Sequence, residues 1–408
     1  EVTRGPFGWV DRSALRKKVM ELLARLGQHI SPDAKVKSLS LAQQQMVEIA
    51  KSISIDARIL IMDEPSSILT DQELITLFQL IRQLKQQQYS IIYISHRMPE
   101  IFEICDRATV MRDGQTINVH AIGEVDEATL VREMVGRPLT SFFQSSAAKP
   151  GEVVLQTRGL ERKGVLRNID LTLRQGEITG LTGLVGSGRT ELARAIFGAD
   201  SIDKGTMELN GTPYAPRSPR DAVQAGIALL TEDRKGQGLA LHMNVRENIS
   251  LATLDRVCRY GLIARTRESS AASKYVEDLR IKTPTIEQKV RNLSGGNQQK
   301  VVLAKWLAAD AKVLIFDEPT RGIDVGAKTE IYQLINTLAE EGKAILLISS
   351  ELPEVMNTCH RILVMRDGTI QGELQAGEAT QERILALAMG LDAGSLIGEK
   401  ASPAGQGN

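Results

Sequence analysis

The sequence has few cysteines and no excess of charge of either sign. Its 408 residues include only three cysteines, Cys105, Cys258 and Cys359, which lie far apart and form no Cys-x-x-Cys pair. This pattern predicts neither a zinc site nor a disulfide framework, and it is typical of a reducing compartment. The 50 basic and 50 acidic residues balance each other, whereas proteins that bind the backbone of DNA or RNA usually carry a basic excess. We therefore expect no nucleic-acid partner.

Long apolar runs are also missing. The longest, such as Ala344–Ile348, have the length of a strand and fall far below the roughly 20 residues that a membrane helix needs. No apolar segment follows a basic start at the N-terminus, so we expect no signal peptide. With 42% hydrophobic and 25% charged residues, the composition is that of a globular chain long enough for two domains. If the protein works at a membrane, a partner is expected to supply the span.

An internal repeat organises the chain. Two stretches that begin at Leu39 and Leu293 align without a gap at an offset of 254 residues. Within them, Ile59-Leu-Ile-Met-Asp-Glu-Pro65 matches Val313-Leu-Ile-Phe-Asp-Glu-Pro319. Solenoid repeats run to about 50 residues, so each copy is predicted to be a whole domain.

The repeat also predicts the domain boundaries. Residues 145–151 are rich in small residues and contain Pro and Gly, so we expect a linker there. Residues 152–390 are expected to form a complete second domain, and the Gly-, Ala- and Ser-rich tail 391–408 to be disordered. Residues 1–144 are expected to be the C-terminal part of a first domain, because the glycine-rich segment at Gly183 has no counterpart 254 residues earlier.

A glycine-rich loop follows a short apolar strand, predicted over Glu177–Thr182, and precedes a helix predicted over Glu191–Phe197. This context is typical of a phosphate-binding P-loop, in which backbone N–H groups and the helix N-terminus face the anion. Thr190 would place a hydroxyl on Mg²⁺. The consensus lysine is replaced by Arg189, which is not a conservative change. Taken alone, the pattern could also be a strand-to-helix turn without a ligand. The loop comprises Gly183, Leu184, Val185, Gly186, Ser187, Gly188, Arg189 and Thr190.

Two carboxylates end a predicted buried strand, Val313–Glu318. Asp317 could hold Mg²⁺ through water, and Glu318 could orient an attacking water. Solvated acids at a strand end are common, so this pair alone is a weak signal. Its combination with a P-loop about 130 residues earlier is a much stronger one.

The segment Leu293-Ser-Gly-Gly-Asn-Gln-Gln-Lys300 precedes a helix predicted over Gln298–Leu307. Ser294, Gly295 and Gly296 would direct a hydroxyl, backbone N–H groups and a helix dipole at one anion. The alternative is a simple helix N-cap, which needs one serine only.

These residues carry a resemblance. Leu293-Ser-Gly-Gly is the signature of ABC ATPases, and residues 1–390 resemble the tandem ATP-binding subunits of ribose-type monosaccharide importers, without the N-terminal half of the first nucleotide-binding domain. Arg189, Thr231-Glu-Asp-Arg-Lys235 and the segment Asp317–Asp324 are similar to the second domain of that group. The resemblance implies an α/β fold with two P-loop NTPase domains, each having a parallel core sheet and a helical subdomain, the first incomplete. It also implies ATP and Mg²⁺ as cofactors.

The resemblance further implies roles for individual residues. Glu64 and Glu318 would orient the attacking water, and Asp63 and Asp317 would hold Mg²⁺. His96 would be the switch histidine that contacts the γ-phosphate. Glu232 stands where other ABC proteins have the Q-loop glutamine.

In such dimers each ATP lies between one domain's P-loop and the other's signature, so two unequal sites are expected. Ser350 replaces the switch histidine in the second copy, and Leu41-Ala42 follows Ser40 where glycines are usual. The site with Arg189 should therefore mainly hold nucleotide, while the site with Glu64 should hydrolyse it. This chain alone is expected to be weakly active.

The partners implied by the resemblance are integral membrane permease subunits and, indirectly, a periplasmic sugar-binding protein. The expected location is peripheral, at the cytoplasmic face of the plasma (inner) membrane, with Glu232 and Met243–Leu251 near a short cytoplasmic helix of the permease. Two alternatives stay open: a catalytically incompetent ATP-binding fragment, and a soluble tandem ABC ATPase outside transport. The short linker, whose only charge is Lys149, disfavours the second alternative.

Overall fold

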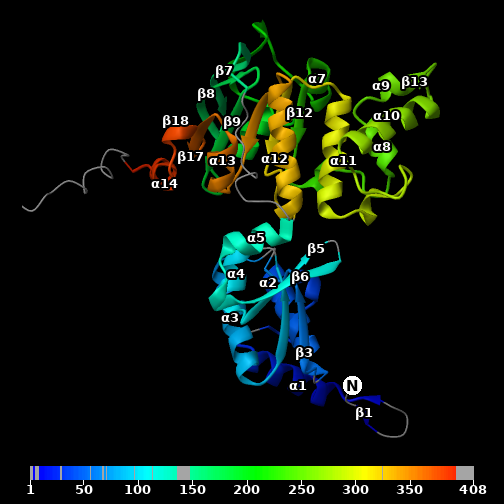
Figure 1. The fold of residues 1–408 in the computed structure, drawn as a ribbon, viewed down its shortest axis with the longest axis vertical. Helices are drawn as coiled ribbons and strands as arrows, with labels where there is room; N and C mark the ends of the chain where they lie inside the picture. Colours follow the sequence, from blue (N-terminus) through cyan, green and yellow to red (C-terminus); the bar gives the residue numbers. More distant parts are fainter. Residues whose placement is uncertain are drawn as a thin grey trace, which may run out of the picture. The chain divides into compact units, whose positions relative to one another are not determined.

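The chain forms two compact units, Glu1–Arg137 and Pro138–Asn408, which are described separately (Figure 1). The expected linker, in part, and residues 392–408 of the expected tail lie outside the described residues. The computed structural model describes residues 3–4, 9–27, 30–55, 57–66, 69, 71–95, 97–112, 114–135, 148–323 and 325–391.

A six-stranded sheet forms the centre of the second unit. Five neighbouring strands are parallel, and only the last pair, β17 with β18, is antiparallel. The strand β9 lies between β16 and β17, although it precedes both in sequence by more than a hundred residues. In spatial order the strands are β12 (Ile227–Leu230), β15 (Val313–Asp317), β16 (Ala344–Ile348), β9 (Ile178–Gly183), β17 (Arg361–Arg366) and β18 (Thr369–Gln375).

Both faces of this sheet are covered. Every residue of β15 and β16 is buried, which explains why these strands are continuous apolar runs without alternation. Figure 1 shows α12 lying along the sheet. The helices that flank the sheet include α6 (Arg189–Ile196), α7 (Pro219–Ala225), α12 (Val325–Glu340), α13 (Leu352–Thr358) and α14 (Gln381–Met389).

An antiparallel sheet and a group of helices complete the second unit. The sheet has the order β11 (Thr212–Pro213), β10 (Lys204–Leu209), β7 (Val153–Arg162) and β8 (Leu166–Arg174). The helical group contains α8 (Val245–Ser250), α9 (Leu254–Val257), α10 (Arg265–Asp278) and α11 (Gly295–Ala308), with the hairpin β13 (Cys258–Arg259) and β14 (Leu262–Ile263).

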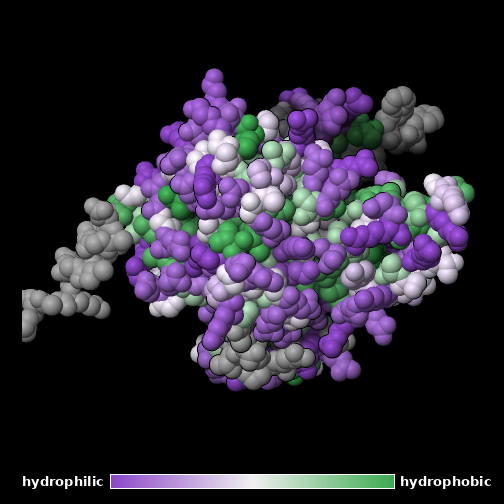
Figure 2. All heavy atoms as spheres, turned by 90° about the horizontal axis from the view of Figure 1, so that it is seen from above, coloured by the Kyte–Doolittle hydropathy of each residue, from purple (hydrophilic) through white to green (hydrophobic). Residues whose placement is uncertain are grey.

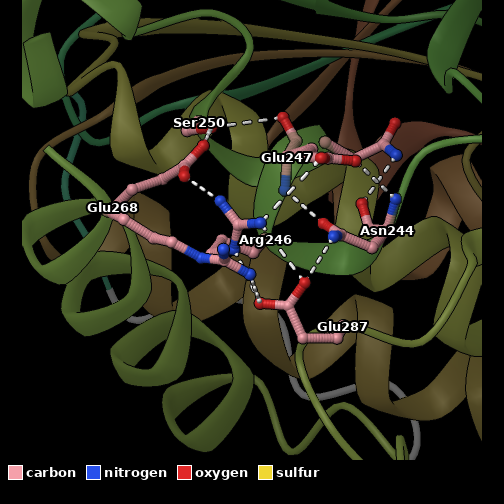
Figure 3. A network of polar contacts seen from close by, with 8 residues as sticks. Asn244, Arg246, Glu247, Ser250, Glu268 and Glu287 are labelled. Carbon is pink, nitrogen blue, oxygen red and sulfur yellow. Dashed lines mark hydrogen bonds and ion pairs between the residues drawn. The ribbon is translucent and has the colours of Figure 1, made fainter. Parts of the chain in front are cut away.

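A buried guanidinium holds the helical group together (Figure 3). Arg246 on α8 is 7% exposed and donates hydrogen bonds to Glu268 on α10 and, at 2.9 Å, to Glu287. Asn244 and Ser250 donate to the same two carboxylates. The ionised partners satisfy a cation that would be costly to bury alone.

The first unit repeats a large part of the second. From α2 to α5, each helix and strand begins and ends 254 residues before its counterpart, so that β3 matches β15 and β4 matches β16. The elements are β1 (Thr3–Arg4), β2 (Trp9–Val10), α1 (Arg12–Arg25), α2 (Leu41–Ser54), β3 (Ile59–Asp63), α3 (Asp71–Gln86), β4 (Ser90–Ile94), α4 (Met98–Ile104), β5 (Arg107–Arg112), β6 (Gln115–Ala121) and α5 (Glu127–Val135).

Equivalent strands differ in burial between the two units. β3 alternates between exposed and buried residues, whereas β15 is buried throughout; Ile61 is 68% exposed and its counterpart Ile315 is fully buried. In the second unit β16 pairs with β15 on one side and β9 on the other. In the described part of the first unit, β4 pairs with β3 alone. Because alternate side chains of a strand point to opposite faces, the exposed residues of β3 share one face. Among the described residues, that face lacks the cover that the second unit provides, where α6 packs on β15.

Some element boundaries differ from those predicted. The helix predicted over Gln298–Leu307 begins at Gly295, because Ser294 already has the extended backbone of an N-cap residue. Likewise, the helix predicted from Glu191 begins at Arg189, directly after the left-handed Gly188. Both shifts place residues of the expected binding segments in the first turn of a helix.

The surface seen in Figure 2 is largely hydrophilic, with hydrophobic residues in small separate groups. In the part of the chain that the structure describes, no helix is both long and apolar enough to span a membrane.

A turn that occurs in both units offers a matched test of this packing. Gly368 and its counterpart Gly114 share a φ of +77°, but a Cβ on Gly368 would lie 2.0 Å from the Val165 carbonyl oxygen while one on Gly114 would meet nothing within 4 Å. Gly114→Ala should cost about 1 kcal/mol of unfolding free energy, from backbone strain alone, and Gly368→Ala about 3 kcal/mol. Urea denaturation, monitored by hydrogen exchange of peptides from each unit, measures both free energies of unfolding. Equal losses in the two variants would contradict the packing described.

Candidate functional site

The glycine-rich loop joins β9 to α6 in the second unit. Gly188 is the N-cap residue of α6, with a φ of +101°, and no side chain caps the helix there. The first N–H groups of a helix have no partner inside it. These donors, together with the helix dipole, are therefore available to an anion at the loop.

A turn between β17 and β18 holds the loop in place. The Gly368 N–H donates to the Ser187 carbonyl oxygen at 2.9 Å, and the Arg167 N–H donates to the Gly368 carbonyl oxygen at 2.8 Å. Val185, at the tip, is 96% exposed. The backbone is thus fixed at its base while the tip side chain faces solvent, as a cradle made of main-chain groups requires.

The two carboxylates lie at the end of β15. Asp317 is the last residue of the strand, and Glu318 follows with a φ of +47°. The Glu318 N–H donates to the Ile348 carbonyl oxygen at 2.9 Å. A left-handed backbone is uncommon for glutamate, and such strain is often found at functional sites.

The first unit builds the same backbone around Glu64. Its φ is +44°, and its N–H donates to the Ile94 carbonyl oxygen, also at 2.9 Å. Asp63 and Glu64 are exposed, whereas Asp317 is 2% exposed. His96, the predicted switch histidine, lies outside the described residues.

Burial governs the electrostatics of the carboxylates in the second unit. It raises the pKa of Asp317 to about 6, against a hydrogen bond from Thr190 and the charge of Arg189. Burial also raises the pKa of Glu318, against hydrogen bonds from Ser350 and the charge of Arg189. The Arg189 Nη1 atom lies 3.7 Å from the Glu318 Oε1 atom. This separation is too long for a hydrogen bond.

Several buried polar atoms at the loop have no hydrogen-bond partner among the described residues: Ser187 Oγ, Arg189 Nη1 and Asp317 Oδ1. Leaving such atoms unpaired is costly. Two of them are donors that a phosphate oxygen would satisfy, and the third is an oxygen of the kind that Mg²⁺ prefers. The residues present therefore fit a phosphate group and a magnesium ion.

The metal ligands would be few. Asp317 and Thr190, which opposes the rise of the Asp317 pKa, offer one carboxylate and one hydroxyl. The described residues contain no group of three or more His, Cys, Asp or Glu side chains that could hold a metal ion. Mg²⁺ usually completes its shell with water and substrate phosphates, so such an ion would depend on a bound nucleotide.

Glu232 forms an ion pair with Arg321. Arg321 belongs to the turn that follows Glu318, and its N–H donates to the Glu318 carbonyl oxygen at 3.2 Å. The predicted Q-loop position is thus connected to the carboxylate turn.

The predicted signature differs from a simple helix cap. Ser40 in the first unit makes a capping box with Gln43. Ser294 makes no such bond to its helix backbone; its Oγ atom accepts from Asn297 Nδ2 at 2.9 Å. The helix-cap alternative therefore describes Ser40 and not Ser294.

Sequence reasoning assigned no role to Arg234. This guanidinium donates to the carbonyl oxygens of Arg321, at 2.8 Å, and Gly322, at 3.1 Å, and burial lowers its pKa. A Cβ on Gly295 would lie 2.8 Å from Arg234 Nη2. A basic residue shortly after the buried strand β12 was the available signal.

The structure brings only part of the predicted set together. The loop, Asp317, Glu318 and Ser350 converge at the ends of neighbouring parallel strands, where ligands of such sheets bind. Gly295 and Gly296 lie close to other groups instead: an added Cβ would be 2.8 Å from Arg234 Nη2 at Gly295 and 2.8 Å from Ala327 Cβ at Gly296.

Known proteins resemble this chain over nearly its whole length. A family model described as ABC transporter matches residues 6–67 and 166–321. A ribose import ATP-binding protein from Rubrobacter xylanophilus is 52% identical over 387 residues, which is 95% of this chain and 78% of that protein. A ribose import ATP-binding protein from Bacillus licheniformis is 49% identical over 384 residues, or 94% of this chain and 78% of that protein.

A solved ATP-binding cassette of an ABC transporter superposes with a TM-score of 0.51 at 21% identity, covering 58% of this chain and 98% of that one. This likeness concerns the fold alone. It confirms the predicted fold class, a parallel core sheet with a helical subdomain.

The raised pKa of Asp317 predicts a pH-dependent stability cost. Its folded pKa of about 6 exceeds the ordinary 3.8, so the folded state binds more protons and loses stability as pH rises through this interval. Without nucleotide and divalent cations, Asp317→Asn should therefore stabilise the second unit by up to about 3 kcal/mol above pH 6, and by nothing near pH 3. Urea denaturation across this pH range measures the effect.

The exposed counterpart supplies the control for this experiment. Asp63→Asn should change the stability of the first unit by less than about 0.5 kcal/mol at any of these pH values. Destabilisation by Asp317→Asn at pH 7.5 would show that the buried carboxylate does not lower the free energy of unfolding.

Proposed function

This chain belongs to the ABC transporter family, and from that premise we propose that it is the ATP-binding subunit that energises uptake of ribose or a similar monosaccharide through a membrane permease. The relatives in Rubrobacter xylanophilus and Bacillus licheniformis bear the name of ribose import ATP-binding proteins. Their identity to this chain over nearly its whole length supports the same activity, ATP hydrolysis coupled to sugar import.

One observation carries the assignment of ATP to the second unit. Ser187 Oγ, Arg189 Nη1 and Asp317 Oδ1 are buried and unpaired around one loop, and a phosphate with its cation would satisfy all three. The proposed cradle is Gly183–Thr190. Arg189 would bind phosphate oxygens as a planar fork, where a lysine acts as a point charge.

The carboxylates have separate proposed roles. Asp317 and Thr190 would hold Mg²⁺, which neutralises phosphate charge when it is bound. Glu318, held by the Ile348 carbonyl oxygen and hydrogen-bonded by Ser350, would orient the attacking water. Ser350 is shorter than a histidine and has no ionisable ring, which supports slow hydrolysis at this site.

The first unit is proposed to be the C-terminal part of another nucleotide-binding domain, and residues 152–390 a complete one. The register of the elements at 254 residues supports this division. Asp63, Glu64 and His96 would then correspond to Asp317, Glu318 and Ser350. Ser294–Gly296 would be the signature segment, and Glu232 the Q-loop residue.

The proposed partners are integral membrane permease subunits, and indirectly a periplasmic sugar-binding protein. The chain would be peripheral at the cytoplasmic face of the plasma membrane. Import by an ATP-binding subunit needs a separate channel for the sugar, and the names of the relatives support this assembly.

Nucleotide binding tests the assignment directly. Arg189→Ala should weaken MgATP binding at least about tenfold, because a charge-assisted bond in a buried site is worth about 1.5–3 kcal/mol. Arg217→Ala, which removes an exposed guanidinium from the same unit, should leave the affinity unchanged. Isothermal titration calorimetry decides; equal affinities for both variants would refute the proposed cradle.

Crosslinking tests the permease partner. Leu251, at the end of α8, and Leu385, on α14, are 42% and 39% exposed. A photo-crosslinking residue at position 251 should form adducts with the cognate permease in membranes, since Met243–Leu251 is the proposed contact. The same residue at position 385 should form few. Adducts from neither position, in a complex that copurifies, would place the contact elsewhere.

A further inference from the structure

A buried carboxyl group, that of Glu354, lies near Glu318, the proposed catalytic carboxylate of the second unit. Glu354, in the first turn of α13, is 1% exposed. Ser349, at the end of β16, donates a hydrogen bond to it, and Thr320 Oγ1 donates at 3.2 Å. The side chain of Tyr332 on α12 is buried close to the same carboxyl group, and burial together with the charge of that group raises the pKa of the phenol. Two hydroxyl groups thus donate to one side chain, and a third lies near it.

The first unit contains the same cluster. Glu100 on α4 is 2% exposed. Its Oε2 atom accepts from Ser66 Oγ at 2.7 Å, Tyr93 OH at 2.8 Å and Ser95 Oγ at 3.1 Å. Glu100, Ser66 and Ser95 stand 254 residues before Glu354, Thr320 and Ser349.

The tyrosine comes from a different element in each unit. In the first unit it is Tyr93 on β4, whose counterpart on β16 is Leu347. In the second unit it is Tyr332 on α12, whose counterpart on α3 is Phe78. Each copy has one tyrosine hydroxyl for the carboxyl group, and the ring without a hydroxyl, or the aliphatic chain, fills the other position.

This exchange shows what the cluster requires. Shared descent of the two copies would explain identical residues, but it does not explain a hydroxyl that moves from a strand to a helix and reaches the same acceptor. A buried carboxyl group is stabilised by each hydroxyl group that can donate to it. We therefore infer that each copy keeps a tyrosine hydroxyl beside the carboxyl group, whichever element supplies it.

The cluster joins the two segments that surround Glu318. Thr320 lies two residues after Glu318, in the turn that follows β15. Ser349 lies one residue before Ser350, which opposes the rise of the Glu318 pKa. The corresponding residues of the first unit, Ser66 and Ser95, lie at the same distances along the chain from Glu64 and His96.

We propose that Glu354 and the three hydroxyl groups around it form a positioning device for hydrolysis, which holds the Glu318 turn in register with the end of β16. The inference rests on the function proposed above. Glu354 touches neither nucleotide nor water in this role; it acts through Thr320 and Ser349. Because Glu318 has a strained backbone, its side chain depends on such outside contacts to keep one orientation.

The two clusters differ in charge. Arg97 Nη1 lies 3.0 Å from Glu100 Oε1, whereas the counterpart of Arg97 is Glu351, which pairs with Lys328 at 2.5 Å. Burial raises the pKa of Glu354 to about 7. The cluster around Glu354 therefore relies more on hydroxyl groups and less on a cation than the cluster around Glu100. The loss of one hydroxyl group should disturb the carboxyl group more in the second unit than in the first.

The exchange of tyrosines supplies the experiment. MgATP affinity and single-turnover hydrolysis, with protein in excess of radiolabelled ATP, are measured for Tyr332→Phe, for the double variant Tyr332→Phe/Leu347→Tyr, and for Glu318→Gln as the blank. Tyr332→Phe should slow hydrolysis about tenfold, the effect of one lost hydrogen bond at a buried acceptor, with affinity changed less than twofold. The double variant copies the first unit and should recover most of the rate.

One control variant and one second test variant complete the experiment. Tyr275→Phe removes a hydroxyl that donates to the Leu307 carbonyl oxygen at 3.2 Å in the helical group, and it should change neither quantity. Thr320→Val removes a second donor from Glu354 and should slow hydrolysis like Tyr332→Phe, even if the double variant does not fold.

Several outcomes would overturn the inference. Wild-type rates in Tyr332→Phe and Thr320→Val would do so, as would a folded double variant that stays slow. A chain that binds MgATP but hydrolyses it no faster than Glu318→Gln would also overturn it, because the positioned carboxylate would then have no effect. Failure of the unmodified chain to bind MgATP would instead refute the proposed function itself.

Discussion

The pairing of β9 between β16 and β17 is the constraint on which the site depends. This pairing brings the loop after Gly183 beside the strand ends that carry Glu318 and Ser350, although these segments are far apart in sequence. It also gives β16 a strand neighbour on both sides. A parallel sheet presents the carboxyl ends of all its strands at one edge, so a single strand insertion assembles the cradle and the carboxylates together.

The same burial creates the electrostatic character of the site. Taking Asp317 and Glu318 out of water raises the pKa of both groups, and Arg189 compensates only in part, at 3.7 Å. Without a ligand, the site holds carboxylates that are poorly solvated and donors that are unpaired. Such a site is unfavourable for folding and favourable for binding a phosphate with its cation, the usual trade between stability and function.

The two units serve as an internal comparison. The left-handed glutamate, the hydrogen bond from its N–H group and the hydroxyl cluster behind it occur in both. These features depend on contacts within one unit, and a common chain path reproduces them. Burial of the aspartate differs, because it depends on surroundings that the two units do not share. The cap at the helix start differs for a local reason: Gln43 completes a capping box with Ser40, whereas its counterpart Asn297 donates to the Ser294 hydroxyl.

The sequence by itself determined a great deal about this protein. Three features can be recognised directly in the order of residues: the glycine spacing at Gly183–Thr190, the paired acids at Asp317 and the repeat at 254 residues. Each of them is a pattern of residue types along the chain and needs no knowledge of the surroundings. The tertiary structure alone decided which acids are buried and that Arg234 lies beside Gly295. It also decided that Tyr93 and Tyr332, from different elements, lie near equivalent carboxyl groups. Burial and the reach of a side chain are properties of surroundings that come from distant parts of the chain, and no local pattern encodes them.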